Sequence, residues 1–232
     1  MKSLVSGKSV YPSDYIVPDR KKTLCITGHR EKSISSYNGN PIYRNITVSA
    51  VKLMLCRYID MAIERGYENF ISGLAVGTDL WAAQYIAEKR RLHSNIRLIG
   101  AMPYLRHAER FPENYRKLLL QVEQQADFLV TVNEDPDIIY GAHSAGGNCS
   151  KNLYRDRNYY MVDNSSAVIA FLNKEGTISG TAQTVNYANR RGLKVCRFGI
   201  EDVFEIMEAS GPDIQKIKRE LSFLENVFDL PY

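Results

Sequence analysis

The chain has 232 residues, of which 44% are hydrophobic and 24% are charged, as is usual for a soluble globular protein. No apolar run approaches the length of a membrane span, and the first residues lack the apolar core of a signal peptide. The net charge of +4 permits an anionic ligand, but the lysines and arginines are scattered among acids, which argues against an extended nucleic-acid surface.

Cysteine and histidine spacing bears on redox state and metal binding. The four cysteines lie far apart and form no CxxC pair, which favours reduced thiols in a cytoplasmic protein. The four histidines form no ligand-spaced cluster with cysteine or carboxylate. We therefore expect no metal site and no cofactor.

Residues 1–20 mix serine, tyrosine, proline and charge without a period, so we expect a loosely ordered N-terminal arm. From residue 21 onward, short apolar runs alternate with helical patterns. The apolar runs predict strands at residues 23–27, 70–71, 96–101, 127–132, 167–171 and 194–198. Helical spacing predicts helices near residues 45–65, 77–87, 112–126, 153–162, 182–192 and 212–228.

Strands that alternate with helices imply right-handed crossovers and a mainly parallel sheet covered on both faces. We therefore predict an α/β fold, a Rossmann-like three-layer α/β/α sandwich, as a single domain over residues 21–232 with a C-terminal helix. That helix either packs back on the domain or forms a dimer contact. The ligand crevice is expected at the carboxyl ends of the strands at residues 23–27, 70–71, 127–132 and 167–171.

Residues 69–81 form a strand, a glycine turn and a helix, and this unit is the strongest candidate for an anion site. Gly77, Thr78 and Asp79 open the helix, whose first N–H groups and positive dipole end favour an anion. Gly73 and Gly77 have no side chain to keep a phosphate away, so we expect Gly77→Val to weaken nucleotide binding while the fold survives. The spacing matches neither the dinucleotide nor the phosphate-loop motif, so a tight turn without a ligand stays open.

Two further stretches reach the same edge of the predicted sheet. Gly28, His29 and Arg30 follow the first strand, where His29 and Arg30 are anion-capable donors. Gly180 and Thr181 belong to a second glycine-rich turn before a helix. Residues 133–150 form an irregular segment that is either a lid or a surface loop. Tyr104 either stacks on a base or fills the rim of the crevice.

Together these motifs resemble the YpsA-like branch of the SLOG superfamily, which is named after the SMF/DprA proteins and the LOG (Lonely Guy) phosphoribohydrolases. The resemblance covers roughly residues 22–198. It rests on residues 27–30, residues 72–83, Arg157 with Met161 and Val162, and Gly180 and Thr181 with Thr184. It implies a Rossmann-like fold that binds a nucleotide or a nucleotide-derived ligand, such as an NAD-related or ADP-ribose-like molecule.

The chain departs from this family pattern at two places. LOG enzymes are similar in carrying a PGGxGTxxE motif, whose glutamate falls on Thr184 here, and no Pro-Gly-Gly precedes it. Threonine cannot act as a carboxylate, so hydrolysis would need another acid, either Asp79 or Glu175. Ser165 and Ser166 stand where YpsA-like sequences tend to carry Ser-Asp, so a contact made by that acid is in doubt.

Two functions stay open at this point. The first is a module that binds or senses a nucleotide-derived small molecule, and the second is a nucleotide N-glycosidase with Asp79 as the candidate catalytic group. DprA-like single-stranded DNA binding is less favoured, because the chain has no basic stripe interleaved with aromatics. The resemblance also favours a homo-oligomer, and we expect no membrane partner. The expected ligand-binding residues are Gly28, His29, Arg30, Ser72, Gly73, Gly77, Thr78, Asp79, Arg157, Gly180 and Thr181.

Overall fold

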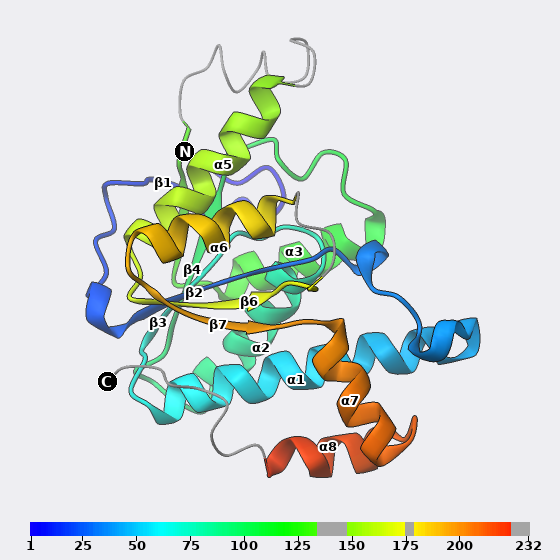
Figure 1. The fold of residues 1–232 in the computed structure, drawn as a ribbon. Helices are drawn as coiled ribbons and strands as arrows, with labels where there is room; N and C mark the ends of the chain where they lie inside the picture. Colours follow the sequence, from blue (N-terminus) through cyan, green and yellow to red (C-terminus); the bar gives the residue numbers. More distant parts are fainter. Residues whose placement is uncertain (134–147, 175–178, 224–232) are drawn as a thin grey trace.

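The computed structural model describes residues 1–133, 148–174 and 179–223, and within them the strands form one parallel sheet (Figure 1). The strand order is β1-β5-β4-β3-β2-β6-β7, and every neighbouring pair is parallel. The strands are β1 (Tyr11–Pro12), β2 (Thr23–Gly28), β3 (Asn69–Ser72), β4 (Arg97–Met102), β5 (Phe128–Thr131), β6 (Ala167–Phe171) and β7 (Lys194–Phe198). The predicted parallel sheet is confirmed.

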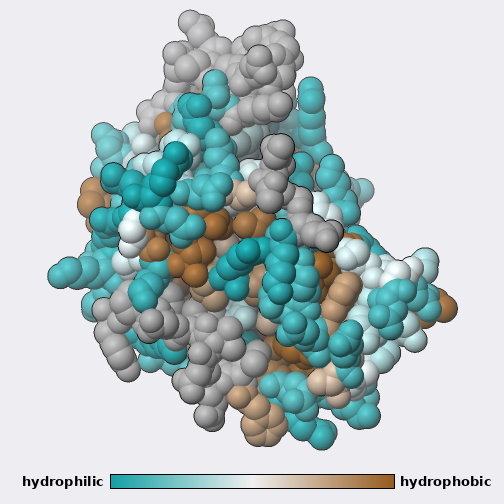
Figure 2. All heavy atoms as spheres, viewed as in Figure 1, coloured by the Kyte–Doolittle hydropathy of each residue, from teal (hydrophilic) through white to brown (hydrophobic). Residues whose placement is uncertain are grey.

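Helices cover both faces of the sheet, which confirms the three-layer arrangement. The helices are α1 (Arg44–Glu64), α2 (Thr78–Arg90), α3 (Glu113–Gln125), α5 (Asn148–Asp163), α6 (Gly180–Arg190), α7 (Ile200–Ser210) and α8 (Ile214–Ser222). Figure 1 shows α5 and α6 on one side of the sheet, with α1, α7 and α8 on the other. Figure 2 shows hydrophilic side chains over much of this view, with hydrophobic atoms in the band between the two helix layers.

The central strands supply side chains to two separate cores. Leu24 and Ile26 of β2 pack into the core beneath α1, α2 and α3, whereas Cys25 faces the core beneath α5 and α6. Both sets are fully buried, as expected for strands of a parallel sheet covered on two faces.

The order of the strands determines where a ligand can enter. From β2 the chain moves outward through β3, β4 and β5, and α5 then returns it to β6 on the other side of β2. The turns that follow β2 and β6 therefore lead to opposite faces of the sheet. The gap between their carboxyl ends is the usual ligand position in an open α/β sheet.

The first residues are packed more closely than the sequence suggests. Tyr11 and Pro12 pair with Val130 and Thr131 of β5, and Val10 is only 1% exposed. The Ser3 hydroxyl donates to the Glu123 carboxylate on α3. A two-residue strand that pairs with a segment so distant in sequence leaves no periodic pattern, which is why residues 1–20 read as a loose arm.

The C-terminal helix packs back on the rest of the chain. Ile217 and Leu221 of α8 are buried in the same core as α1 and α7. Residue 224 onward lies outside the described residues. In the part of the chain that the structure describes, no helix combines the length and apolarity needed to cross a bilayer.

Candidate functional site

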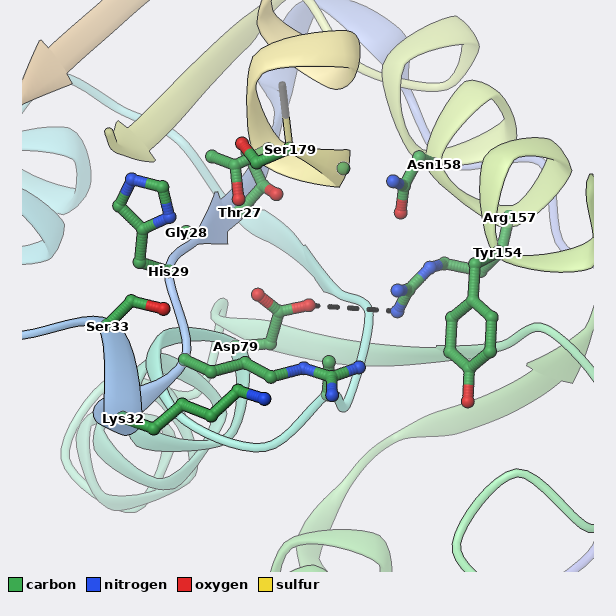
Figure 3. Close-up of a pocket in the computed structure, with 14 residues that line it drawn as sticks. Thr27, Gly28, His29, Lys32, Ser33, Asp79, Tyr154, Arg157, Asn158 and Ser179 are labelled. Atoms are coloured by element: carbon green, nitrogen blue, oxygen red, sulfur yellow. Dashed lines mark ion pairs between the residues drawn. The ribbon is translucent and has the colours of Figure 1, made fainter. Parts of the chain in front are cut away.

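A pocket of about 360 Å³ lies where the turns after β2 and β6 diverge (Figure 3). Its walls come from the turn after β2, the short helix η2 (Glu31–Ser33), the start of α2, one face of α5 and the start of α6. Of the predicted site residues, those that line it are Gly28, His29, Arg30, Asp79, Arg157, Gly180 and Thr181. The topology thus brings residues from four segments of the chain to one cavity.

Asp79 and Arg157 form a buried pair at this pocket, drawn as a dashed line in Figure 3. Arg157 Nη1 lies 3.7 Å from Asp79 Oδ2, and their side chains are only 4% and 6% exposed. The same Arg157 nitrogen donates to the Gly73 carbonyl oxygen. Arg157 therefore connects α5 to both the turn after β3 and the first turn of α2.

The pKa of Asp79 is raised to about 6, chiefly by burial. The Arg157 charge and backbone hydrogen bonds from Ala75 and Gly28 oppose that rise, because they favour the carboxylate. Burial also lowers the pKa of Arg157, while Asp79 raises it. Asp79 can therefore gain or lose a proton within about one unit of neutral pH.

The glycine turn before α2, the strongest sequence candidate, is filled by protein. A Cβ at position 73 would collide with the Arg157 guanidinium, and a Cβ at position 77 would lie 2.8 Å from the Arg30 Cα. Gly77 also adopts a φ of +98°, which side chains rarely tolerate. These glycines allow two parts of the chain to approach each other.

Ser72 and Thr78 also make internal contacts. The Thr78 hydroxyl donates to the His29 carbonyl oxygen at 2.8 Å, and the Thr78 N–H points to the same oxygen at 3.4 Å. The Ser72 hydroxyl donates to the Asp79 carbonyl oxygen at 2.8 Å. The first turn of α2 is thus covered by the turn after β2, and Ser72, Gly73, Gly77 and Thr78 do not line the pocket.

The N-terminus of α6 opens into the pocket instead. Ser179 caps this helix by accepting the Ala182 N–H at 3.1 Å. A Cβ at Gly180 would meet no atom of a described residue within 4 Å. The N–H groups of Gly180 and Thr181 make no backbone hydrogen bond to any described residue. The start of a helix, whose first N–H groups have no partner within the helix, favours an anion.

The lining of the pocket carries more positive than negative charge. Among the described residues of the lining, Arg30, Lys32 and Arg157 stand beside one carboxylate, Asp79. Burial lowers the pKa of His29, which leaves its imidazole neutral near pH 7. The pocket is therefore suited to a ligand with at least one anionic group.

Several lining residues were not predicted. Lys32 and Ser33 lie in η2, in a stretch that reads as a featureless polar loop. Tyr154 and Asn158 lie three residues before and one residue after Arg157 on α5, so all three share one helix face. In the sequence, the spacing of Tyr154 and Asn158 around Arg157 is enough to predict that they reach the same pocket.

Other sequence candidates fall elsewhere. Tyr104 is 2% exposed and packs edge-on against Tyr154 at 6.1 Å between ring centres, so it fills space beside the site. The Thr184 hydroxyl donates to the Gly180 carbonyl oxygen at 2.8 Å. Glu175 and most of the 133–150 segment lie outside the described residues. Among the residues that are described, no three His, Cys, Asp or Glu side chains gather as a metal site requires.

Comparisons with known proteins agree with this architecture. The YpsA family model, described as the YspA SLOG family, matches residues 24–198. A UPF0398 protein of Halalkalibacterium halodurans is 27% identical over 115 residues, which are 50% of this chain and 59% of the relative. The SPbeta prophage-derived protein YoqJ of Bacillus subtilis is 28% identical over 65% of this chain and 86% of its own. The structure of DNA processing protein A from Streptococcus pneumoniae aligns over 85% of this chain and 61% of that one, with 16% identity and a TM-score of 0.45. Because the family model covers most of the chain, this protein belongs to the YpsA family of SLOG proteins.

Proposed function

We propose that the pocket binds a nucleotide-derived anion, of the NAD-related or ADP-ribose-like class, without consuming it. Membership of the SLOG family supports a nucleotide-related role in general. The observation that carries the proposal is the open N-terminus of α6, which shares one cavity with Arg30 and Lys32. The N–H groups of a helix start beside two cationic side chains are a donor set suited to phosphate.

The remaining lining residues suit the sugar end of such a ligand. The ionised Asp79 accepts hydrogen bonds, and the Asn158 amide both donates and accepts. Figure 3 shows Asp79 between Lys32 and Ser179, and Asn158 on α5 beside the start of α6. In this assignment the phosphate contacts Gly180, Thr181, Arg30 and Lys32, and a ribose hydroxyl donates to Asp79.

The sharpest test uses Gly180, because a Cβ there would meet no described residue within 4 Å and Gly180 has no positive φ. In Gly180→Leu we expect the melting temperature to stay near that of wild type, while calorimetric affinity for ADP-ribose, NAD or AMP falls at least about tenfold. Gln183→Leu is the matched control, since Gln183 is an exposed residue of the same helix outside the pocket lining. Equal affinity in Gly180→Leu and Gln183→Leu would rule out the start of α6 as the phosphate site.

One observation favours an N-glycosidase as a second candidate function. Asp79 is a buried carboxylate at the pocket wall with a pKa raised to about 6, and perturbed carboxylates of this kind often serve as acid or base. This candidate predicts free base released from a nucleoside phosphate, with a rate that rises with pH through about 6 if ionised Asp79 is required. The rate would vanish in Asp79→Asn. If chromatography finds no free base from any nucleotide in a panel although the nucleotides still bind, the N-glycosidase is ruled out and the binding function stands.

A further inference from the structure

The connection from β6 to α6 begins with two backbone amides that are held by side chains from distant parts of the chain. The Asn173 N–H donates to His29 Nε2 at 3.2 Å, and the Lys174 N–H donates to Glu201 Oε1 at 2.8 Å. The Asn173 side chain in turn accepts the Ile200 N–H at 3.0 Å. Because Asn173 and Lys174 precede Ser179 and the start of α6 in the chain, the anchoring of these two residues bears on where the anion-binding N–H groups lie.

His29 is itself fixed from several directions. Its N–H donates to the Phe171 carbonyl oxygen at 3.1 Å, and its carbonyl oxygen accepts the Thr78 hydroxyl at 2.8 Å. Its ring packs edge-on against Phe171, with 5.8 Å between ring centres. Since Nε2 accepts a hydrogen bond from Asn173, the imidazole must be neutral and carry its proton on Nδ1.

Resting on the proposed function, we propose that His29 is a positioning residue: its neutral imidazole holds Asn173, where the chain leaves β6, against the turn after β2, and so steadies the anion-binding start of α6 that follows in the chain. This role differs from a direct charge contact between a protonated His29 and the anion. A ligand that accepts a hydrogen bond from Nδ1 of the neutral ring would strengthen the bond at Nε2, because donation at Nδ1 polarises the imidazole and makes Nε2 a better acceptor.

The two roles make opposite predictions about pH. Protonation gives Nε2 a hydrogen that faces the Asn173 N–H, so the anchor is lost as pH falls through the His29 pKa. Burial lowers that pKa below its usual value, Glu201 on α7 raises it and Arg197 on β7 lowers it. A direct charge contact would instead tighten anion binding as His29 becomes charged. Asp79, whose pKa is raised to about 6, also changes charge as pH falls, so wild type must be compared with a variant that lacks the imidazole.

The anchor is tested first without a ligand, by NMR of the ¹⁵N-labelled protein between about pH 5 and 8. We expect the Asn173 amide shift to follow His29 titration in wild type, with a lower hydrogen-exchange protection factor at low pH. In His29→Gln, whose side-chain oxygen can replace Nε2 as acceptor, the amide should keep its protection factor at every pH. In His29→Ala the protection factor should be low throughout, while His93→Gln, at an exposed histidine, should behave as wild type. An Asn173 amide that ignores both pH and His29→Ala would overturn the proposal.

The second arm measures ADP-ribose binding by calorimetry. At pH 7.5 we expect His29→Ala to weaken binding at least about tenfold and His29→Gln to stay within about threefold of wild type. Tighter wild-type binding at low pH that is absent from His29→Gln would overturn the positioning role, as would equal losses in the two variants. If the Asn173 amide follows His29 but ADP-ribose, NAD and AMP all fail to bind wild type, the anchor stands and the proposed function fails alone.

Discussion

Asp79 and Arg157 depend on each other because each is almost completely removed from water. Desolvation opposes both charges, raising the pKa of Asp79 to about 6 and lowering that of Arg157. When one partner of a buried ion pair is removed, the other charge is left uncompensated, and the cost is commonly about 3–5 kcal/mol. The pair therefore makes stability at this site sensitive to pH.

Arg157→Leu should raise the pKa of Asp79 beyond about 6, because the main charge that opposes the rise is gone. A carboxyl whose folded pKa lies above its unfolded value supplies stability that is present below the unfolded pKa and is lost as pH rises through the folded one. We therefore expect the loss in unfolding free energy to be larger at pH 8 than at pH 5, as measured by urea denaturation. Adding Asp79→Asn should remove this difference, and an equal loss at both pH values would refute the coupling.

The sequence predicts an individual site residue only where that residue's place at the end of a strand already brings it to the pocket. Gly28 ends the central strand β2, and His29 and Arg30 directly follow it, so the place of these residues at the carboxyl edge of the sheet could be predicted, and they line the pocket. Lys32 is there because η2 turns the chain back, with the Glu31 carbonyl accepting a hydrogen bond from Arg44 at 2.7 Å. The residues around Lys32 contain no pattern from which this contact between η2 and Arg44 could be predicted.

The two strand-glycine-helix turns look alike in sequence and differ in what covers them. At α2 the turn after β2 lies against the first helical turn, since β2 and β3 are neighbours in the sheet and Thr78 bonds to His29. At α6 the first turn faces the gap between diverging connections. Which helix start stays open depends on strand order, and strand order cannot be read from either turn alone.

Gly77→Val should therefore destabilise the fold, contrary to the expectation from sequence. Valine would be forced to a φ of +98° with its Cβ against the Arg30 backbone, and strain of this kind costs about 1–3 kcal/mol or more. Gly180→Val is the matched control, because position 180 is open and free of positive φ. Thermal unfolding should show a melting temperature several degrees lower for Gly77→Val than for Gly180→Val, and equal values would contradict the packing described at Gly77.

Across the whole molecule, the layering could be predicted, but the edge of the sheet formed by β1 could not. Alternating strands and helices fix a parallel sheet with two covered faces, and both cores follow from it. The two-residue β1 pairs with β5, more than a hundred residues away in the chain, and this pairing depends on the backbone and not on particular side chains. Side-chain patterns carry no information about such an edge.

Whether α8 is part of one cooperative unit with the sheet can be tested at Ile217, which is fully buried in the core that also contains Trp81. Ile217→Ala should lower the unfolding free energy by about 2–5 kcal/mol, whereas Lys218→Ala, at the exposed neighbouring position, should change it by less than about 0.5 kcal/mol. Trp81 is the only tryptophan, so its fluorescence reports on α2 while circular dichroism reports on all helices. Because both side chains belong to one core, we expect the two signals to shift together in Ile217→Ala. A shifted dichroism transition beside an unchanged Trp81 transition would mean that α8 unfolds separately, and the single domain predicted for residues 21–232 would then be wrong.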